Sequence, residues 1–224
     1  MARSEHEIGI LNQKVEEYLH SLLPKRDPVL SAIEKDAAKR GVPIIGPLVG
    51  TVISMFVRSA EAENALEIGT ATGYSAIWIS RALHGRNRKL TTIEMDEDRR
   101  RAARRNFEKA GVAERIEILA GNAKVIVPKI SETQAENFGV VFLDVGDKTL
   151  YVELLEPCLK ALRVGGFLIA DNTLWGGEVA NPKNNATETE TIRRFNELVF
   201  GDRRLDAAII PLRDGFTVAH KKKQ

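Results

Sequence analysis

The chain has 224 residues, of which 43% are hydrophobic and 29% charged, as is usual for a soluble globular protein. Lysine and arginine total 33 against 31 aspartates and glutamates, and the net charge of +2 excludes a strong general attraction to nucleic acid. The length suits one α/β domain, which we expect to cover 1–224, with an N-terminal helical segment at 1–60 and a ligand-binding core at 61–224.

The cysteine content and the apolar runs limit the cellular setting. A single cysteine, Cys158, excludes an intrachain disulfide framework and favours a reducing, cytoplasmic location. Cys158 stands at helical spacing from the apolar residues Leu155 and Leu162, which predicts that its side chain lies in the core. Residues 1–10 lack the apolar centre of a signal peptide, and no apolar run approaches the ~20 residues of a membrane span.

Helices are expected first along the chain. Apolar residues recur at helical spacing over 8–23, which predicts a first amphipathic helix. A second helix begins after the cap Asp27 with Pro28 in its first turn and ends before Gly41. A connector at 43–47 then leads into a third helix at 49–58.

From residue 64 the chain alternates between strand and helix patterns, which indicates a parallel sheet with helices on both faces. The predicted strands lie at 64–68, 89–94, 115–120, 139–144 and 166–171, and the predicted helices at 73–83, 96–110, 122–130 and 149–163. After a helix at 188–200, strands at 205–211 and 215–220 are joined by a turn too short for a parallel crossover. We therefore expect a mostly parallel, seven-stranded sheet with a C-terminal antiparallel hairpin.

Polar side chains follow two apolar strands. Asp144 comes directly after 140–143, and Asp171 and Asn172 come directly after 166–170. The carboxyl ends of parallel strands border the ligand crevice of an open α/β sheet. Carboxylate and amide oxygens are suitable ligands for Mg²⁺, Mn²⁺ or Ca²⁺, so these residues predict a site for one divalent cation. The long polar loop at 181–190 follows the second of these strands and is a candidate functional loop.

A glycine turn follows the strand at 64–68. Gly69 and Gly73 allow backbone to approach a ligand, but the third glycine of the dinucleotide fingerprint is absent, which counts against an NAD-dependent oxidoreductase. Glu67 would suit a ligand with a cationic amino group. Glu94 ends the next strand, where a carboxylate can accept both hydroxyls of a ribose. The pattern predicts a nucleoside cofactor without a pyrophosphate.

The segment 66–75, Leu-Glu-Ile-Gly-Thr-Ala-Thr-Gly-Tyr-Ser, resembles the cofactor motif of class I S-adenosylmethionine-dependent methyltransferases. Within these it is similar to the cation-dependent O-methyltransferase family, which includes the caffeoyl-CoA and catechol O-methyltransferases. Matching stretches at 93–96, 142–151, 171–177 and 214–216 follow in order, and the similarity runs from about Gly41 to Lys221. The resemblance implies a single-domain, Rossmann-like methyltransferase fold.

The resemblance also implies roles for single residues. Asp144, Asp171 and Asn172 would hold the metal, Lys148 would act as general base beside Asp144, and Trp175 would line the acceptor pocket with Lys148. The residues implied to bind S-adenosylmethionine are Ile45, Gly46, Glu67, Gly69, Thr70, Gly73, Tyr74, Ser75, Glu94, Met95, Asn122, Ala123 and Asp144.

One departure from the family pattern affects the predicted base. Relatives usually place the lysine three residues after the first metal aspartate, whereas Lys148 stands four residues after Asp144. Either the loop bulges at Gly146 and Lys148 still reaches the metal, or its role in proton transfer is lost. Asp147 is a competing metal ligand.

The expected function is metal-dependent O-methylation of a small aromatic vicinal diol by a homodimer. Two alternatives stay open: methylation of a hydroxylated uridine in tRNA, and cofactor binding by a protein whose metal site is impaired. The arginine-rich helix at 96–110 is interleaved with acidic residues, which favours a solvated surface over an RNA-binding one. The sequence does not select the acceptor itself.

Overall fold

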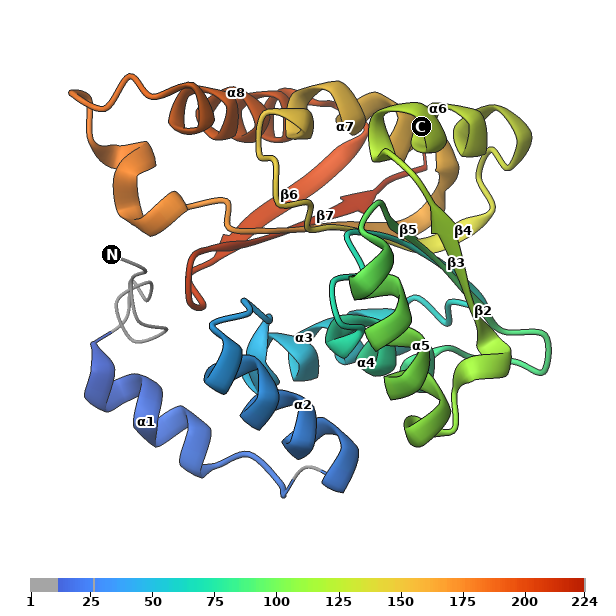
Figure 1. Ribbon diagram of the computed structural model, residues 1–224. Coiled ribbons are helices and arrows are strands. Elements are labelled where there is room, and N and C mark those ends of the chain that lie inside the picture. Colours follow the sequence, from blue (N-terminus) through green and yellow to red (C-terminus); the bar gives the residue numbers. More distant parts are fainter. Residues whose placement is uncertain (1–11, 26, 224) are drawn as a thin grey trace.

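The computed structural model describes residues 12–25 and 27–223 (Figure 1). The first helix, α1, covers Gln13–Ser21, with Asn12 as its cap. The N-terminal part of the helix predicted at 8–23 and the segment at 1–10 that was tested for a signal peptide lie outside the described residues. No helix in the described part of the chain is long and apolar enough to span a membrane.

Seven strands form one sheet in the order β3-β2-β1-β4-β5-β7-β6. The pairs from β3 to β5 are parallel, whereas β7 pairs antiparallel with both β5 and β6, so the predicted mixed sheet is confirmed. The strands are β1 (Asn64–Ile68), β2 (Lys89–Glu94), β3 (Ile116–Ala120), β4 (Phe138–Leu143), β5 (Leu162–Asp171), β6 (Leu205–Ile210) and β7 (Phe216–Lys221).

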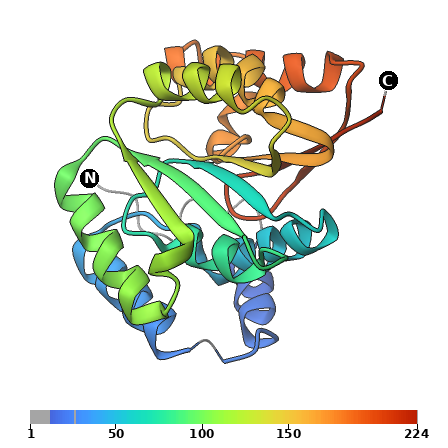
Figure 2. The same ribbon diagram turned by 90° about the vertical axis from the view of Figure 1, so that its right-hand side faces the viewer.

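Helices cover both faces of the sheet, as predicted (Figures 1 and 2). One face carries α2 to α5 and the other α6 to α8, and a short helical segment at Trp175–Ala180 follows β5. The remaining helices are α2 (Pro28–Arg40), α3 (Gly46–Ser59), α4 (Tyr74–Ala82), α5 (Glu97–Ala110), α6 (Ala123–Thr133), α7 (Leu150–Ala161) and α8 (Thr187–Gly201).

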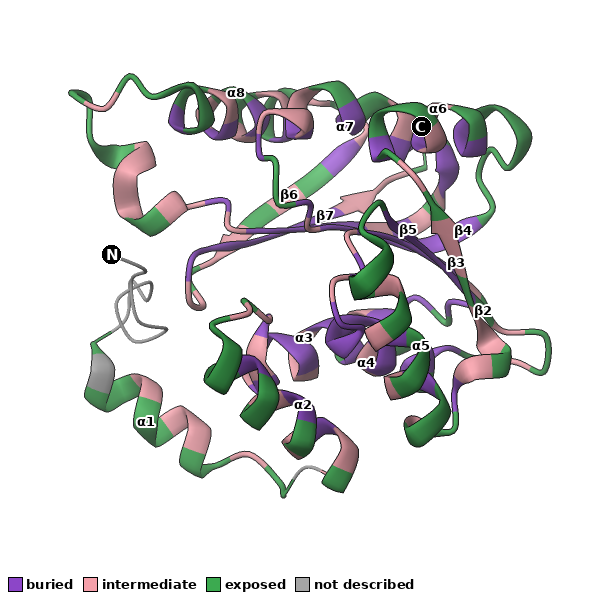
Figure 3. Ribbon diagram, viewed as in Figure 1, coloured by how far each residue is buried: buried purple, intermediate pink, exposed green. Residues whose placement is uncertain are grey.

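Buried residues lie along the central strands and on the helices of both layers (Figure 3). Successive side chains of a strand point to opposite faces of the sheet, so the core is divided between the two helical layers. Val140 and Phe142 of β4 pack with α2 to α5, whereas Val141 and Leu143 pack with α6 to α8. All four side chains are fully buried, which is why β4 reads as a continuous apolar run. Cys158 lies in the second layer and is completely buried, as predicted.

Some boundaries differ from the predictions. β5 begins at Leu162 instead of 166, because Leu162 pairs with Phe138 before the register shifts and Gly165 takes a φ of 76°. α3 begins at Gly46 instead of 49, with Pro47 in its first turn, where proline is tolerated. β7 extends to Lys221, one residue beyond the strand predicted at 215–220, and the Nζ of Lys221 donates to the carbonyl oxygens of residues 159 and 162.

The topology fixes where a ligand can bind. The chain runs from β1 outward to β3 and then returns to place β4 on the other side of β1. Helices therefore diverge at the carboxyl ends of β1 and β4, and crevices form at such a switch point in open α/β sheets. Asp144 directly follows β4 at this edge, and Asp171 ends the neighbouring β5.

Candidate functional site

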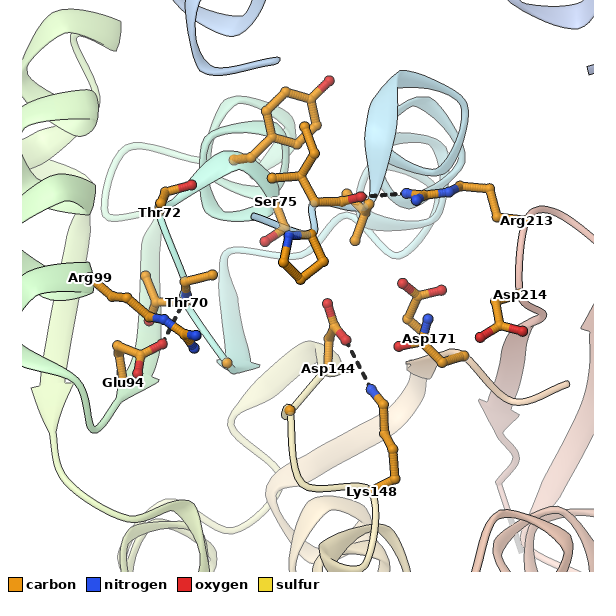
Figure 4. Close-up of a pocket in the computed structure, with 18 of the residues that line it drawn as sticks. Thr70, Thr72, Ser75, Glu94, Arg99, Asp144, Lys148, Asp171, Arg213 and Asp214 are labelled. Atoms are coloured by element: carbon orange, nitrogen blue, oxygen red, sulfur yellow. Dashed lines mark hydrogen bonds and ion pairs between the residues drawn. The ribbon is translucent and has the colours of Figure 1, made fainter. Parts of the chain in front are cut away.

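Two adjoining cavities of about 330 and 300 Å³ lie at this edge of the sheet and share Gly69, Glu94 and Arg99 in their walls (Figure 4). The larger cavity is lined by eleven predicted residues: Ile45, Gly69, Thr70, Tyr74, Ser75, Glu94, Asp144, Lys148, Asp171, Asn172 and Trp175. The smaller one adds Met95, Asn122 and Ala123. Gly46, Glu67 and Gly73 line neither cavity.

Gly69 lies at the junction between the two predicted halves of the site. Its φ is 108°, and a Cβ at this position would lie 2.1 Å from the carbonyl oxygen of Asp144. Glycine is therefore required here both for the backbone conformation and for the close approach of the two loops. This contact brings the turn after β1 directly against the loop that carries the predicted metal ligand.

Glu94 is held by backbone N–H groups. Its two carboxylate oxygens accept from the N–H of Ala71 and from that of Asp96, each at 2.9 Å. Each oxygen can accept a further hydrogen bond, and Glu94 lines both cavities. The carboxylate is thus fixed in place with acceptor capacity left for the hydroxyls of a ligand.

Glu67 is completely buried behind the glycine turn. Oε2 accepts from Thr92 Oγ1 at 2.5 Å, whereas no described residue gives Oε1 a hydrogen-bond partner. Burial raises the pKa of Glu67 to about 8, and a hydrogen bond from Ser75 partly opposes the shift. Ser75, its hydrogen-bond partner, lines the larger cavity, whereas Glu67 itself does not.

Tyr74 connects the cavity to the N-terminal helices. It begins α4 and lines the larger cavity, and its hydroxyl donates to Glu34 Oε1 of α2 at 2.7 Å. The segment before Gly41, in which the sequence showed no motif, is therefore fastened to the glycine-rich turn by a direct side-chain contact.

Lys148 lies next to Asp144 in spite of the extra residue between them. Its Nζ is 3.2 Å from Asp144 Oδ1 and 2.9 Å from the hydroxyl oxygen of Tyr151, and only 6% of its side chain is exposed. Figure 4 shows the ammonium group at the end of β4, pointing toward Asp144. Of the two alternatives for the loop, the geometry is that of the bulged one.

Asp147 does not take part in this cluster. It is exposed, and its Oδ1 accepts from the backbone N–H of Thr149 at 3.0 Å and from the Thr149 hydroxyl at 2.6 Å. Asp147 therefore stabilises the start of α7. Gly146, with open space where a Cβ would be, accommodates the additional residue.

Tyr151 ties the ends of two strands together. Its buried hydroxyl oxygen is 3.2 Å from the carbonyl oxygen of Leu143 in β4 and 3.0 Å from that of Asp171 in β5. The same oxygen accepts from Lys148. Tyr151 belongs to one of the stretches that match the family pattern, but no role for it followed from the sequence. In the structure Tyr151 positions both Lys148 and the ends of the two strands.

Asp171 is buried close to a second carboxylate. Burial and the negative charge of Asp144 raise the pKa of Asp171 to about 7. Asn172, the third predicted ligand, donates a side-chain hydrogen bond to Asp214. An amide can donate only through its nitrogen, so Asp214 leaves the Asn172 carbonyl oxygen available for a cation.

Backbone strain is concentrated around the larger cavity. The described residues include six non-glycine residues with positive φ, and four of them line this cavity. They are Ala71, Asn172, Trp175 and Arg213, with φ between 46° and 59°. Strained conformations of this kind persist where the surrounding structure fixes them, and they cluster at functional sites.

Sequence reasoning missed three charged residues in the wall of the larger cavity: Arg99, Arg213 and Asp214. Asp214 was noted only as part of a matching stretch. An indication for Arg213 was available, because it sits in a tight turn directly before Asp214 and Gly215, where a large side chain is unusual. Arg99 could not be separated from the surrounding run of helix arginines by spacing.

The described residues contain no group of three or more histidine, cysteine, aspartate or glutamate side chains that could hold a metal. The predicted metal ligands do not form a group of this kind, because only Asp144 and Asp171 carry carboxylates and the third ligand, Asn172, carries an amide. Its members line one cavity.

Comparisons with known proteins agree with this arrangement. A catechol O-methyltransferase from Niastella koreensis is 32% identical over 202 residues, covering 89% of this chain and 90% of that protein. The O-methyltransferase from Bacillus cereus in complex with SAH superposes with a TM-score of 0.84 at 31% identity, covering 93% of this chain and 97% of the other. An O-methyltransferase from Streptomyces achromogenes in complex with SAM, involved in tomaymycin synthesis, gives 0.85 at 30% identity, covering 99% and 100%.

The sequence profile of one family covers most of the described chain, including every residue of the two cavities. The match extends over residues 25–222, and the profile is that of the O-methyltransferases. The chain therefore belongs to the O-methyltransferase family.

Proposed function

We propose that the protein transfers a methyl group from S-adenosylmethionine to one hydroxyl of an aromatic vicinal diol, with the help of a divalent cation. The observation that carries this proposal is the cluster of Asp144, Lys148, Asp171 and Asn172 in the same cavity as the cofactor residues. Two relatives near 30% identity were solved with SAM or SAH, which supports S-adenosylmethionine as the methyl donor.

The chemistry of the donor set fits a hard divalent cation. Asp144 and Asp171 would supply carboxylate oxygens and Asn172 an amide oxygen, which is the ligand type preferred by Mg²⁺ and Mn²⁺. Burial, together with the negative charge of Asp144, raises the pKa of Asp171, and a cation held by both carboxylates would offset this cost. When bound, the cation would orient the two acceptor oxygens and lower the pKa of the hydroxyl that reacts.

Lys148 is the residue placed to receive the proton. As a neutral amine, its Nζ would take the proton of the reacting hydroxyl. The acceptor oxygen then forms a bond to the methyl carbon while the carbon–sulfur bond breaks, and sulfur leaves as a neutral thioether. An anion reacts here with a sulfonium cation, so the cavity mainly has to align the reactants and exclude water.

The acceptor is proposed to be a small aromatic compound. The Trp175 ring lines the cavity beside Asn172 and offers a flat surface for stacking. Two of the arginines of α5 are engaged within the protein: Arg101 pairs with Glu97 and Asp98, and Arg100 donates to backbone carbonyl groups. This pairing favours a small acceptor over tRNA.

Methyl transfer to a simple catechol, with Mg²⁺ and then with excess EDTA, tests the proposal. We expect transfer that EDTA abolishes and that added Mg²⁺ restores. Transfer unaffected by EDTA would contradict the metal-dependent mechanism. Tight SAH binding without transfer to any diol would contradict the proposed acceptor class.

We also propose a homodimer and a cytoplasmic setting. Exposed apolar side chains on α1, at Val15, Tyr18 and Leu22, together with Met55 of α3, offer a surface for a second copy of the chain. Sedimentation analysis, with Tyr18→Lys as the disrupting variant, tests the first proposal, and cell fractionation tests the second.

A further inference from the structure

Arg213 occupies an unusual place at the edge of the larger cavity. It lies in the turn between β6 and β7 with a φ of 49°, a conformation that favours glycine. Its guanidinium crosses to the connector before α3 and donates through Nη1 to the carbonyl oxygen of Ile44. The side chain passes close to Gly46, where an added Cβ would lie 3.4 Å from Nη1. A large cation is thus kept at a strained position in the cavity wall.

Some of the N–H donors of this guanidinium have no hydrogen-bond acceptor among the described residues. The contact with Ile44 uses one nitrogen, and neither Nε nor Nη2 has a hydrogen-bond partner among the described residues. Asp171 and Asp214 line the same cavity without an ion pair to Arg213 among the described residues, and its positive charge partly opposes the rise in the pKa of both groups. An arginine has five N–H donors in a rigid fork that matches a carboxylate, so Arg213 presents unused donors to whatever fills this space.

The neighbours of Arg213 indicate which ligand those donors face. In Figure 4, Arg213 lies on the side of the cavity that holds Asp171 and Asp214. Thr70, Glu94 and Arg99 lie on the opposite side, whereas Ile45 and Gly46, two further residues implied to bind the cofactor, belong to the connector that Arg213 contacts. Arg213 therefore belongs to the part of the wall that we assign to the acceptor.

We propose that Arg213 is a specificity-determining residue that binds a carboxylate carried by the acceptor, so that the preferred substrate is an acidic vicinal diol. The proposal rests on the proposed function and adds the charge of its acceptor. Charge-assisted pairing of a carboxylate with a guanidinium fork is strong in a water-poor cavity. It also gives a reason for an arginine at a backbone position that suits glycine.

A pair of acceptors that differ only in charge tests the proposal: 3,4-dihydroxybenzoate and its neutral amide. For the unaltered protein we expect kcat/KM for the acid to exceed that for the amide by about 10- to 100-fold, as for hydrogen bonds to charged groups. Arg213→Gln and Arg213→Gly should bring this ratio close to one, and Arg213→Lys should leave an intermediate ratio. Glycine adopts a positive φ without strain, so the Arg213→Gly variant is expected to fold.

Arg99→Gln is the matched control, since it removes the same charge from the opposite wall of the same cavity. The acid-to-amide ratio should persist in this variant. Calorimetric titration of acid and amide into the protein with SAH and Mg²⁺ gives a second readout that does not depend on turnover, and it should show the same preference and the same loss in Arg213→Gln.

An unchanged acid-to-amide ratio in the Arg213 variants would overturn the proposal. Arg213 would then have only the structural role of contacting Ile44. A weakened SAH affinity with an unchanged ratio would also overturn it and assign the guanidinium to the carboxylate of the cofactor. If the unaltered protein methylates neither compound, the proposed function fails, and the calorimetric preference alone then decides the role of Arg213.

Discussion

The two sides of the cavity are built by different means. The cofactor side consists of a glycine turn, hydroxyl groups and a carboxylate, Glu94, that backbone N–H groups already hold in place. The acceptor side brings two carboxyl groups together, and burial with the nearby charge of Asp144 raises the pKa of Asp171 to about 7. The first side holds its carboxylate with backbone groups, whereas the second contains a buried carboxyl group whose charged form a bound cation would stabilise.

If this contrast is right, substitutions on the acceptor side should abolish turnover without affecting cofactor binding. Asp171→Asn keeps the shape of the side chain and removes one charge. We expect kcat/KM for a catechol to fall by about 10³-fold, equivalent to ~4 kcal/mol of lost transition-state stabilisation. The Kd for SAH should change by no more than about twofold, as for an independent site. A parallel loss of SAH affinity would show that the two sides are coupled.

Lys148 tests whether the charged cluster performs proton transfer. Lys148→Met should lower kcat by about 10²- to 10³-fold, in the range of general base catalysis. Tyr151→Phe, the control, removes a contact of the lysine and keeps the amine, so its effect should be smaller. The pH dependence of kcat should lose a limb only in Lys148→Met. Equal pH profiles in all three proteins would exclude Lys148 as the base.

On the cofactor side, the expected effects are smaller and appear in binding. Glu94→Gln places an amide nitrogen against the backbone N–H groups of residues 71 and 96 or against the ligand. We expect the Kd for SAH to rise by about 10- to 100-fold, as for lost hydrogen bonds to a charged group. Asp98→Asn, on the exposed surface of α5, should leave the Kd unchanged. An effect of Glu94→Gln on acceptor KM alone would contradict the assignment of this side.

Glu67 should give the smallest effect, and one on stability. Its pKa is raised to about 8 in the folded protein, so the folded state holds this proton more tightly than the unfolded state does. The stability of the cofactor-free protein should then decline as pH rises from about 4.5 to about 8. The Glu67→Gln variant should not show this decline. Its Tm at pH 8 should exceed that of the unaltered protein by about 2–4 °C for each kcal/mol of unfolding free energy that the substitution restores. A pH-independent difference between the proteins would contradict this linkage.

The sequence predicted the sheet and the polar strand ends because both depend on local patterns. Apolar runs such as β4 have a clear length and period, and residues directly after a parallel strand must lie at one edge of the sheet. Gly69, Glu94, Asp144, Asp171 and Asn172 line the larger cavity for this reason, whereas the other six predicted wall residues followed from the resemblance to a family. The start of β5 was missed because the irregular pairing of Leu162 with Phe138 leaves no periodic signal.

Contacts between distant segments could not be predicted in this way. The links from Tyr74 to Glu34 and from Arg213 to Ile44 join residues 40 and 169 positions apart in the chain. No local pattern encodes such a pair. Likewise, Glu67 was expected to contact the cofactor, and only the fold shows that Ser75 stands between Glu67 and the cavity.

The position of β7 has a consequence for the order in which the molecule is assembled. β7 inserts between β5 and β6, so the last strand of the described chain fills an interior place in the sheet. The smaller cavity is lined by segments up to residue 150, whereas Arg213 and Asp214 of the larger cavity follow some 60 residues later in the chain. Since chains fold from the N-terminus during synthesis, the wall of the smaller cavity can form before the turn that carries Arg213 and Asp214 is made.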